Sequence, residues 1–207
     1  MIRIAISLFL LFSLNGTHAA TVYYLHGKIV EDKGDNAVHP IYGTYRYGEI
    51  VAKLRREGHA VHSEIRPPGT DRAAYARVLA TEIRDQIKVG RSPDEIVIIG
   101  FSKGAQIAIL LSQELALPDL RFVFQAVCGS WVQRFADLKV YGNIMSLYET
   151  SDTAGSCAEL FARSIVKSCE VAITTGEKHG AFYRPNEAWM APQRDWLDRG
   201  ICYSQLE

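Results

Sequence analysis

The residues with the clearest chemical potential form the run Gly100-Phe101-Ser102-Lys103-Gly104. It follows the apolar run 95–99 (EIVII), which is typical of a buried parallel strand, and it precedes an expected helix. A serine flanked by glycines at such a turn is the pattern of a nucleophile elbow, because the sharp turn leaves little room for side chains two positions away. The pattern predicts Ser102 as a nucleophile, with Gly100 and Gly104 as the elbow glycines. A phosphate-binding loop or a capping serine is the alternative.

A serine hydroxyl needs a base that takes its proton. His179 lies in the loop GEKHG, after the last expected strand at 170–174. A base that follows both the nucleophile and the acid in the chain fits the order found with such elbows. We therefore predict His179 as the general base. The other histidines after the N-terminal segment all precede Ser102: His26, His39, His59 and His62.

The acid of a triad should follow the strand before the last one, expected at 144–148. The loop after this strand begins Glu149-Thr150-Ser151-Asp152. A carboxylate slightly beyond the strand end can reach the imidazole, so we predict Asp152 and keep Glu149 in reserve. Asp152 would hold one tautomer of His179 and stabilise its charged form. The alternative for Asp152 is an aspartate that caps its own loop.

An oxyanion formed at Ser102 needs two N–H donors. We predict the backbone N–H of Lys103 and that of Lys28, in the loop Leu25-His26-Gly27-Lys28 after the first expected strand. Gly27 permits the unusual backbone angles that such a loop needs, and His26 is expected to brace it. The side chain of Lys103 could meet an acidic substrate. Long cations usually extend into water, however, so we expect it to be solvated.

Strand-like and helix-like runs alternate along the chain, which predicts an α/β fold. Such alternation is typical of a mostly parallel sheet with right-handed crossovers and helices on both faces. The expected strands are 21–25, 60–65, 95–99, 122–127, 144–148 and 170–174, and the expected helices are 45–57, 71–87, 103–115, 158–166 and 187–197.

The charge balance excludes one class of partner. The chain has 207 residues, with 23 Lys and Arg against 23 Asp and Glu. No basic stripe is visible, so we expect no nucleic-acid partner. His59 and His62 have no obvious third ligand, and no dinucleotide-binding glycine pattern occurs, so we expect no metal and no cofactor.

The N-terminal segment is typical of a secretory signal. Arg3 supplies a positive charge, 4–14 is mostly apolar, and Thr17-His18-Ala19 ends in small residues at the positions that a signal peptidase reads. We predict a signal peptide over 1–19, with cleavage after Ala19 or Ala20, and one domain over 20–207. The protein would then be secreted or periplasmic, with no later membrane span. An uncleaved anchor or a buried strand is the alternative.

The sequence resembles the α/β-hydrolase superfamily over residues 22–196. The resemblance rests on four features in chain order: the HG loop, the G-x-S-x-G elbow, the late aspartate and the late histidine. More narrowly, HGKIVED, GFSKGAQIA, YETSD and HGAFYRP are similar to a group of bacterial α/β-hydrolase proteins. The resemblance implies a small lidless member with six strands in the order 2-1-3-4-5-6. It implies hydrolysis of an ester, thioester or related acyl bond through an acyl-enzyme on Ser102. The HG loop lacks the extra glycines of the HGGG type, which puts carboxylesterase or lipase specificity in doubt.

Four cysteines in an exported chain predict two disulfides, and three pairings are open. They are Cys128, Cys157, Cys169 and Cys202. The fold implied by the resemblance places the first two at the active-site face and the last two at the opposite face. It therefore favours the pairs 128–157 and 169–202, since joining 157 to 169 would span a helix of roughly 15 Å.

Two segments are expected to shape the pocket for a small-molecule acyl substrate. The first is the long connection 27–48 with the preceding His26, and its pocket candidates are His26, Gly27 and Glu31. The second is 181–189, which includes Tyr183 and Trp189, although a role in packing the last helix fits Trp189 slightly better. The connection 128–143 is too short for a large lid, so we expect an open site. Two other functions remain: a non-catalytic binding or scaffold protein on this fold, and an acyltransferase that uses the same triad.

Overall fold

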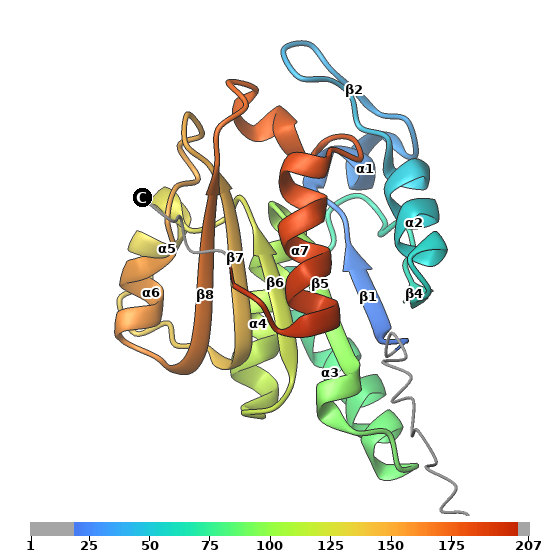
Figure 1. Ribbon diagram of the computed structural model, residues 1–207, viewed down its shortest axis with the longest axis vertical. Helices are drawn as coiled ribbons and strands as arrows, with labels where there is room; N and C mark the ends of the chain where they lie inside the picture. Colours follow the sequence, from blue (N-terminus) through green and yellow to red (C-terminus); the bar gives the residue numbers. More distant parts are fainter. Residues whose placement is uncertain (1–18, 203–207) are drawn as a thin grey trace, which may run out of the picture.

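The structure is a computed structural model that describes residues 19–202. Its centre is a six-stranded sheet in the order β4-β1-β5-β6-β7-β8, in which each neighbouring pair is parallel (Figure 1). The strands are β1 (Thr21–Leu25), β4 (Ala60–His62), β5 (Ile96–Phe101), β6 (Arg121–Gln125), β7 (Tyr141–Glu149) and β8 (Ile165–Ile173). Counting only these six strands, the order is 2-1-3-4-5-6, and the prediction is confirmed.

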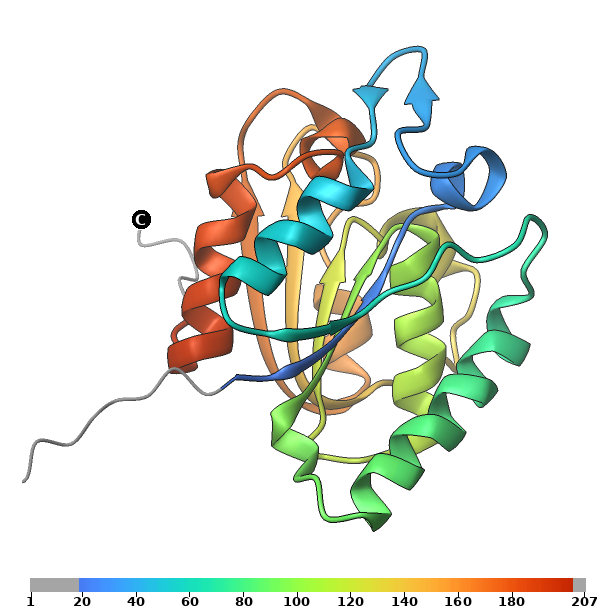
Figure 2. The ribbon, with the colours of Figure 1, turned by 90° about the vertical axis from the view of Figure 1, so that its right-hand side faces the viewer.

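Helices cover both faces of the sheet, as the predicted three-layer architecture requires (Figure 2). One layer contains α2 (Tyr47–Arg56) and α7 (Glu187–Arg199), and the other contains α3 (Arg72–Lys88), α4 (Lys103–Leu115) and α6 (Ala158–Ala162). Side chains of a strand point to alternate faces. On β5, Val97 and Ile99 join the core beneath α2 and α7, whereas Ile96 and Ile98 join the core beneath α3 and α4.

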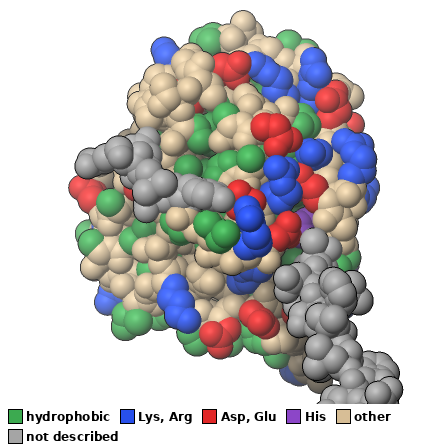
Figure 3. Space-filling view, viewed as in Figure 1, with side chains coloured by type: hydrophobic (Ala, Val, Ile, Leu, Met, Phe, Trp, Pro, Cys, Tyr) green, Lys and Arg blue, Asp and Glu red, His purple; other side chains and the backbone are tan. Residues whose placement is uncertain are grey.

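Acidic and basic side chains alternate over the layer of α2 and α7, without a large patch of one sign (Figure 3). Several of them are paired between the two helices. Glu57, just after α2, contacts Lys53 and Arg194, and Glu187 at the start of α7 contacts the same two cations. On this face, acidic and basic side chains thus neutralise one another locally.

The connection 27–48 and the crossover after β6 contain elements that the sequence pattern did not predict. The connection forms α1 (Lys28–Lys33) and the hairpin of β2 (Val38–His39) and β3 (Gly43–Thr44), and the crossover forms α5 (Gly129–Gln133). Two short 3₁₀ turns add Pro93–Glu95 and Lys178–Phe182. These elements are too short to show a hydrophobic period.

The expected helix 158–166 is too long. It ends at Ala162, and β8 already begins at Ile165, where Ile165 and Val166 are β-branched residues that favour a strand. Cys169 consequently lies in the middle of β8, whereas the expected strand 170–174 would have begun just after it. The expected strand 60–65 is also shorter, since β4 ends at His62.

The described chain contains two disulfides, Cys128–Cys157 and Cys169–Cys202. This is the pairing that the implied fold favoured. Cys128 and Cys157 immediately precede α5 and α6, so the first disulfide joins the starts of two short helices. The second attaches the segment after α7 to β8.

The predicted signal peptide falls on residues 1–18, outside the described part, and on Ala19. Within residues 19–202, none of the helices has the length and apolar character needed to cross a lipid bilayer.

Candidate active site

Ser102 occupies a strained turn between β5 and α4. Its φ of 53° and ψ of −117° lie in a region that residues with a side chain rarely adopt. A Cβ on Gly100 would lie 2.6 Å from the Ala105 Cα, and a Cβ on Gly104 would lie 1.9 Å from the Leu25 carbonyl oxygen. Both positions therefore require glycine for a steric reason, as an elbow does.

His179 and Asp152 are brought together from two loops. His179 Nδ1 lies 2.7 Å from Asp152 Oδ2. A carboxylate only accepts hydrogen bonds, so the ring donates from Nδ1 and leaves Nε2 without its proton in the neutral state. The Asp152 side chain is 6% exposed and that of His179 is 22% exposed. The acid is thus shielded while the imidazole stays accessible.

Ser102 and His179 line the same cavity, whose volume is about 420 Å³. The wall is formed by the first loop with α1, the β2–β3 hairpin, the elbow and the histidine loop. Its other lining residues are Gly27, Lys28, Ile29, Asp32, Lys33, His39, Pro40, Phe101 and Tyr183. Residues that are distant in the sequence therefore lie around Ser102 in this cavity.

The first loop approaches the elbow closely. β1 and β5 are parallel neighbours with Leu25 opposite Gly100, so the turns that follow them lie next to each other. A Cβ on Gly27 would lie 3.0 Å from the Phe101 ring and 3.6 Å from the Ser102 Cβ. Lys28 and Lys103 are the first residues of α1 and α4, and N–H groups at a helix start have no partner one turn earlier. Both N–H groups are thus suited to donate to an oxyanion formed at Ser102.

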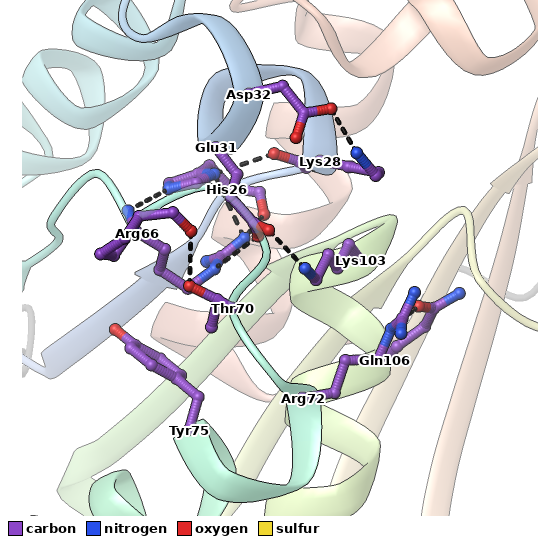
Figure 4. Close-up of polar contacts among 12 residues, drawn as sticks. His26, Lys28, Glu31, Asp32, Arg66, Thr70, Arg72, Tyr75, Lys103 and Gln106 are labelled. Atoms are coloured by element: carbon purple, nitrogen blue, oxygen red, sulfur yellow. Dashed lines mark hydrogen bonds and ion pairs between the residues drawn. The ribbon is translucent and has the colours of Figure 1, made fainter.

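The expectation that the Lys103 side chain is solvated is wrong. Its Nζ lies 2.5 Å from Glu31 Oε1, and the two side chains are 7% and 0% exposed (Figure 4). Glu31 was expected to face the pocket, but it is absent from the cavity lining and is buried on the inner side of α1. The helix α1 has six residues, which are too few to show a helical hydrophobic period in the sequence. This helix turns Glu31 away from the cavity.

His26 braces the first loop from a fully buried position. Its Nε2 accepts the Arg66 backbone N–H at 3.0 Å, so Nδ1 carries the proton and donates to the Gly27 carbonyl oxygen at 2.8 Å. Burial, together with the charge of Arg66, lowers the pKa of His26 to about 4. A neutral His26 therefore fixes the backbone of Gly27, and it is absent from the cavity lining.

Glu149 has a different role from the one kept in reserve for it. Its carboxylate is buried and accepts the Ser151 N–H at 2.7 Å, and the N–H groups of Thr175 and Gly176 at 2.9 Å each. Burial alone would raise the pKa of Glu149, but the hydrogen bonds from Ser151, Thr175 and Gly176 outweigh it and hold the pKa at about 2. Glu149 thus links the loop of Asp152 to the loop of His179. Sequence reasoning missed this link because it depends on the pairing of β7 with β8.

Aromatic side chains form one wall of the cavity. Tyr183 is almost fully buried and meets the rings of Phe101 and Tyr42 edge-on, at centroid distances of 5.9 and 5.6 Å. Phe101 also lies 4.8 Å from the His179 ring. Trp189 is instead buried against Phe182 and contributes to the core. The wall next to Ser102 and His179 is therefore aromatic.

No protein-family model matches the sequence, and no curated protein matches it either. Solved structures do match. A sugar hydrolase from Lactococcus lactis has a TM-score of 0.58 at 12% identity, covering 88% of this chain and 90% of that one. An esterase/lipase from an uncultured bacterium gives 0.57 at 14%, covering 86% and 76%. A candidate dienelactone hydrolase from Klebsiella pneumoniae gives 0.55 at 14%, covering 87% and 86%. Together with the strand order, these similarities show that the chain has the α/β-hydrolase fold.

Proposed function

We propose that the protein is a serine hydrolase that cleaves an ester, thioester or related acyl bond, with Ser102, His179 and Asp152 as its catalytic triad. The proposal rests on one cavity that is lined by Ser102 and by a histidine hydrogen-bonded to an aspartate. Ser102 has the elbow conformation, His179 lines the same cavity, and His179 Nδ1 lies 2.7 Å from Asp152. The hydrolases among the similar structures are in keeping with this activity.

In the proposed reaction, Ser102 Oγ attacks the acyl carbon while its proton passes to His179 Nε2. The oxyanion accepts hydrogen bonds from the backbone N–H groups of Lys103 and Lys28. The intermediate collapses, the bond to the leaving group breaks, and His179 gives its proton to the departing alcohol or thiol. Water then attacks the acyl carbon while His179 takes a proton from the water. The second intermediate collapses as the bond between the acyl carbon and Ser102 Oγ breaks, His179 returns the proton to Oγ, and the acid leaves.

The cavity wall favours an uncharged acyl group of modest size. Phe101 and Tyr183 offer apolar surface beside Ser102, and Lys28 is already paired with Asp32. A volume of about 420 Å³ fits a small ligand. We therefore propose a short or aromatic acyl group as the part of the substrate that lies against the aromatic wall.

The two disulfides favour action in an oxidising compartment, since such bonds persist outside the cytosol. We accordingly propose that the domain 20–207 acts after export, in the periplasm or as a secreted protein.

A panel of p-nitrophenyl esters and acyl thioesters, from acetyl to octanoyl with a benzoyl member, tests the activity. We expect hydrolysis by the oxidised protein that is lost in Ser102→Ala. Hydrolysis that persists in Ser102→Ala would contradict the assignment of the nucleophile.

A further inference from the structure

A buried ion pair joins the two helices whose first residues carry the backbone amides proposed as the oxyanion hole. Glu31 is on α1, three residues after Lys28, and Lys103 is the first residue of α4. Nζ of Lys103 lies 2.5 Å from Glu31 Oε1, with side chains that are 7% and 0% exposed. The pair thus joins the element that carries one amide to the element that carries the other (Figure 4).

Arg66, which follows β4, contacts the Glu31 carboxylate of this pair. Its Nε lies 3.6 Å from Glu31 Oε2, and its side chain is 1% exposed. Arg66 also donates to the carbonyl oxygen of His26 and, through its backbone N–H, to the His26 ring. Glu31 is therefore fixed from both sides, by a cation on α4 and by a cation that holds the first loop.

The helix α1 needs such a fixing contact. It has six residues, and helices this short are unstable without tertiary contacts. Its N-terminal Gly27 makes no side-chain cap, and the partner of Lys28 among residues 19–202 is Asp32 of the same helix, at the surface. On the α4 side, Gly104 already lets the backbone approach Leu25 closely. The Glu31–Lys103 pair is the charged link between these two parts.

We propose that the Glu31–Lys103 ion pair is a positioning device that sets the separation between the Lys28 and Lys103 amides. This inference rests on the proposed function, because it assigns those amides to the oxyanion hole. Neither side chain touches the substrate. Removing the link lets α1 shift against α4, and a displacement of about 1 Å in such a site can cost about a hundredfold in rate.

Loss of the link should therefore slow the formation of the oxyanion and change little else. For Lys103→Met and Glu31→Gln we expect kcat and the rate of fluorophosphonate labelling to fall about ten- to a hundredfold, less than or similar to the loss of one oxyanion donor. KM should stay within about threefold, because the cavity wall is unchanged. The midpoint of the pH–rate profile should also stay, because the His179–Asp152 contact comes from other loops.

The experiment compares the two single variants, the double variant Glu31→Gln/Lys103→Met, and a control, Glu57→Gln. The control makes the same substitution in the ion pairs between α2 and α7, and it should label at the wild-type rate. Lys103→Met keeps Glu31 opposite Arg66, whereas the double variant leaves no charge at either position of the pair but takes the carboxylate away from the buried Arg66. We expect it to fold and to label no faster than the slower single variant, because the link is still absent.

Wild-type labelling rates in the folded double variant would overturn the inference, even if a single variant fails to fold. A loss confined to KM would overturn it as well. Failure of the wild-type protein itself to label at Ser102 would instead refute the proposed function, so the two failures are distinguishable.

Discussion

The carboxylate of Asp152 and the imidazole of His179 meet across two loops that follow the neighbouring strands β7 and β8, with 2.7 Å between Oδ2 and Nδ1. Replacing Asp152 by Asn keeps the shape but offers an N–H where the ring needs an acceptor. We expect kcat/KM for a p-nitrophenyl ester to fall by about 10⁴, as expected when the wrong tautomer is favoured. The exposed Asp137→Asn is the control. Activity of Asp152→Asn within tenfold of wild type would exclude Asp152 as the acid.

Glu149 should support activity through the two loops that it joins. In Glu149→Gln, an NH₂ group replaces the carboxylate oxygen that accepts the Ser151 N–H, so this N–H loses its acceptor. We expect kcat to fall about tenfold, because positioning losses of this kind are smaller than the loss of a reacting group. Glu114→Gln, at the far end of α4, is the control. An unchanged kcat in folded Glu149→Gln would show that the loops are held without it.

The same carboxylate makes the stability of the protein depend on acid. The pKa of Glu149 is about 2 in the folded protein against an ordinary 4.5. A lowered pKa means that its stabilising contribution is present above pH 4.5 and is lost as the pH falls toward 2. The advantage of wild type over Glu149→Gln in urea unfolding should therefore shrink between these two pH values. A constant advantage down to pH 2 would contradict the low pKa.

His26, in the loop after β1, makes the stability depend on pH in the same direction as Glu149. Its folded pKa is about 4 against an ordinary 6.5, so protonation favours the unfolded chain as the pH falls through this window. The linked loss of stability is about 3 kcal/mol at most. NMR titration of the ring signals in the folded protein, assigned with His26→Gln, measures the pKa directly. A titration of His26 near 6.5 would show that it is not the neutral brace described above.

Gly104→Ala tests the packing of the elbow against β1. The new Cβ would lie 1.9 Å from the Leu25 carbonyl oxygen, so the backbone must move. We expect a loss of at least about 2 kcal/mol in the free energy of unfolding and a loss of activity. Gly155→Ala, where the nearest atom is 4.0 Å away, should cost about 1 kcal/mol for its left-handed backbone. Equal losses in the two variants would contradict a specific steric requirement at Gly104.

The sequence was informative where side chains follow a regular period or a strict steric rule. The apolar run before Ser102 and the two glycines predicted the elbow. The alternation of strands with helices predicted a mostly parallel sheet, whereas the strand order was implied by the family resemblance. It was uninformative at Lys103 and Glu31, because their burial depends on the six-residue helix α1. A lysine next to a nucleophile has the same appearance in sequence whether it is solvated or paired. The contacts of Glu149 likewise require the register of β7 and β8.

The most direct test of the proposed serine hydrolase is covalent labelling of the oxidised protein with a fluorophosphonate, read by intact mass and by the peptide that contains Ser102. An activated serine should add one probe per chain at Ser102, and labelling should be lost in Ser102→Ala and strongly slowed in His179→Ala. A folded protein that gains no probe, or that gains it at another residue, would contradict the triad.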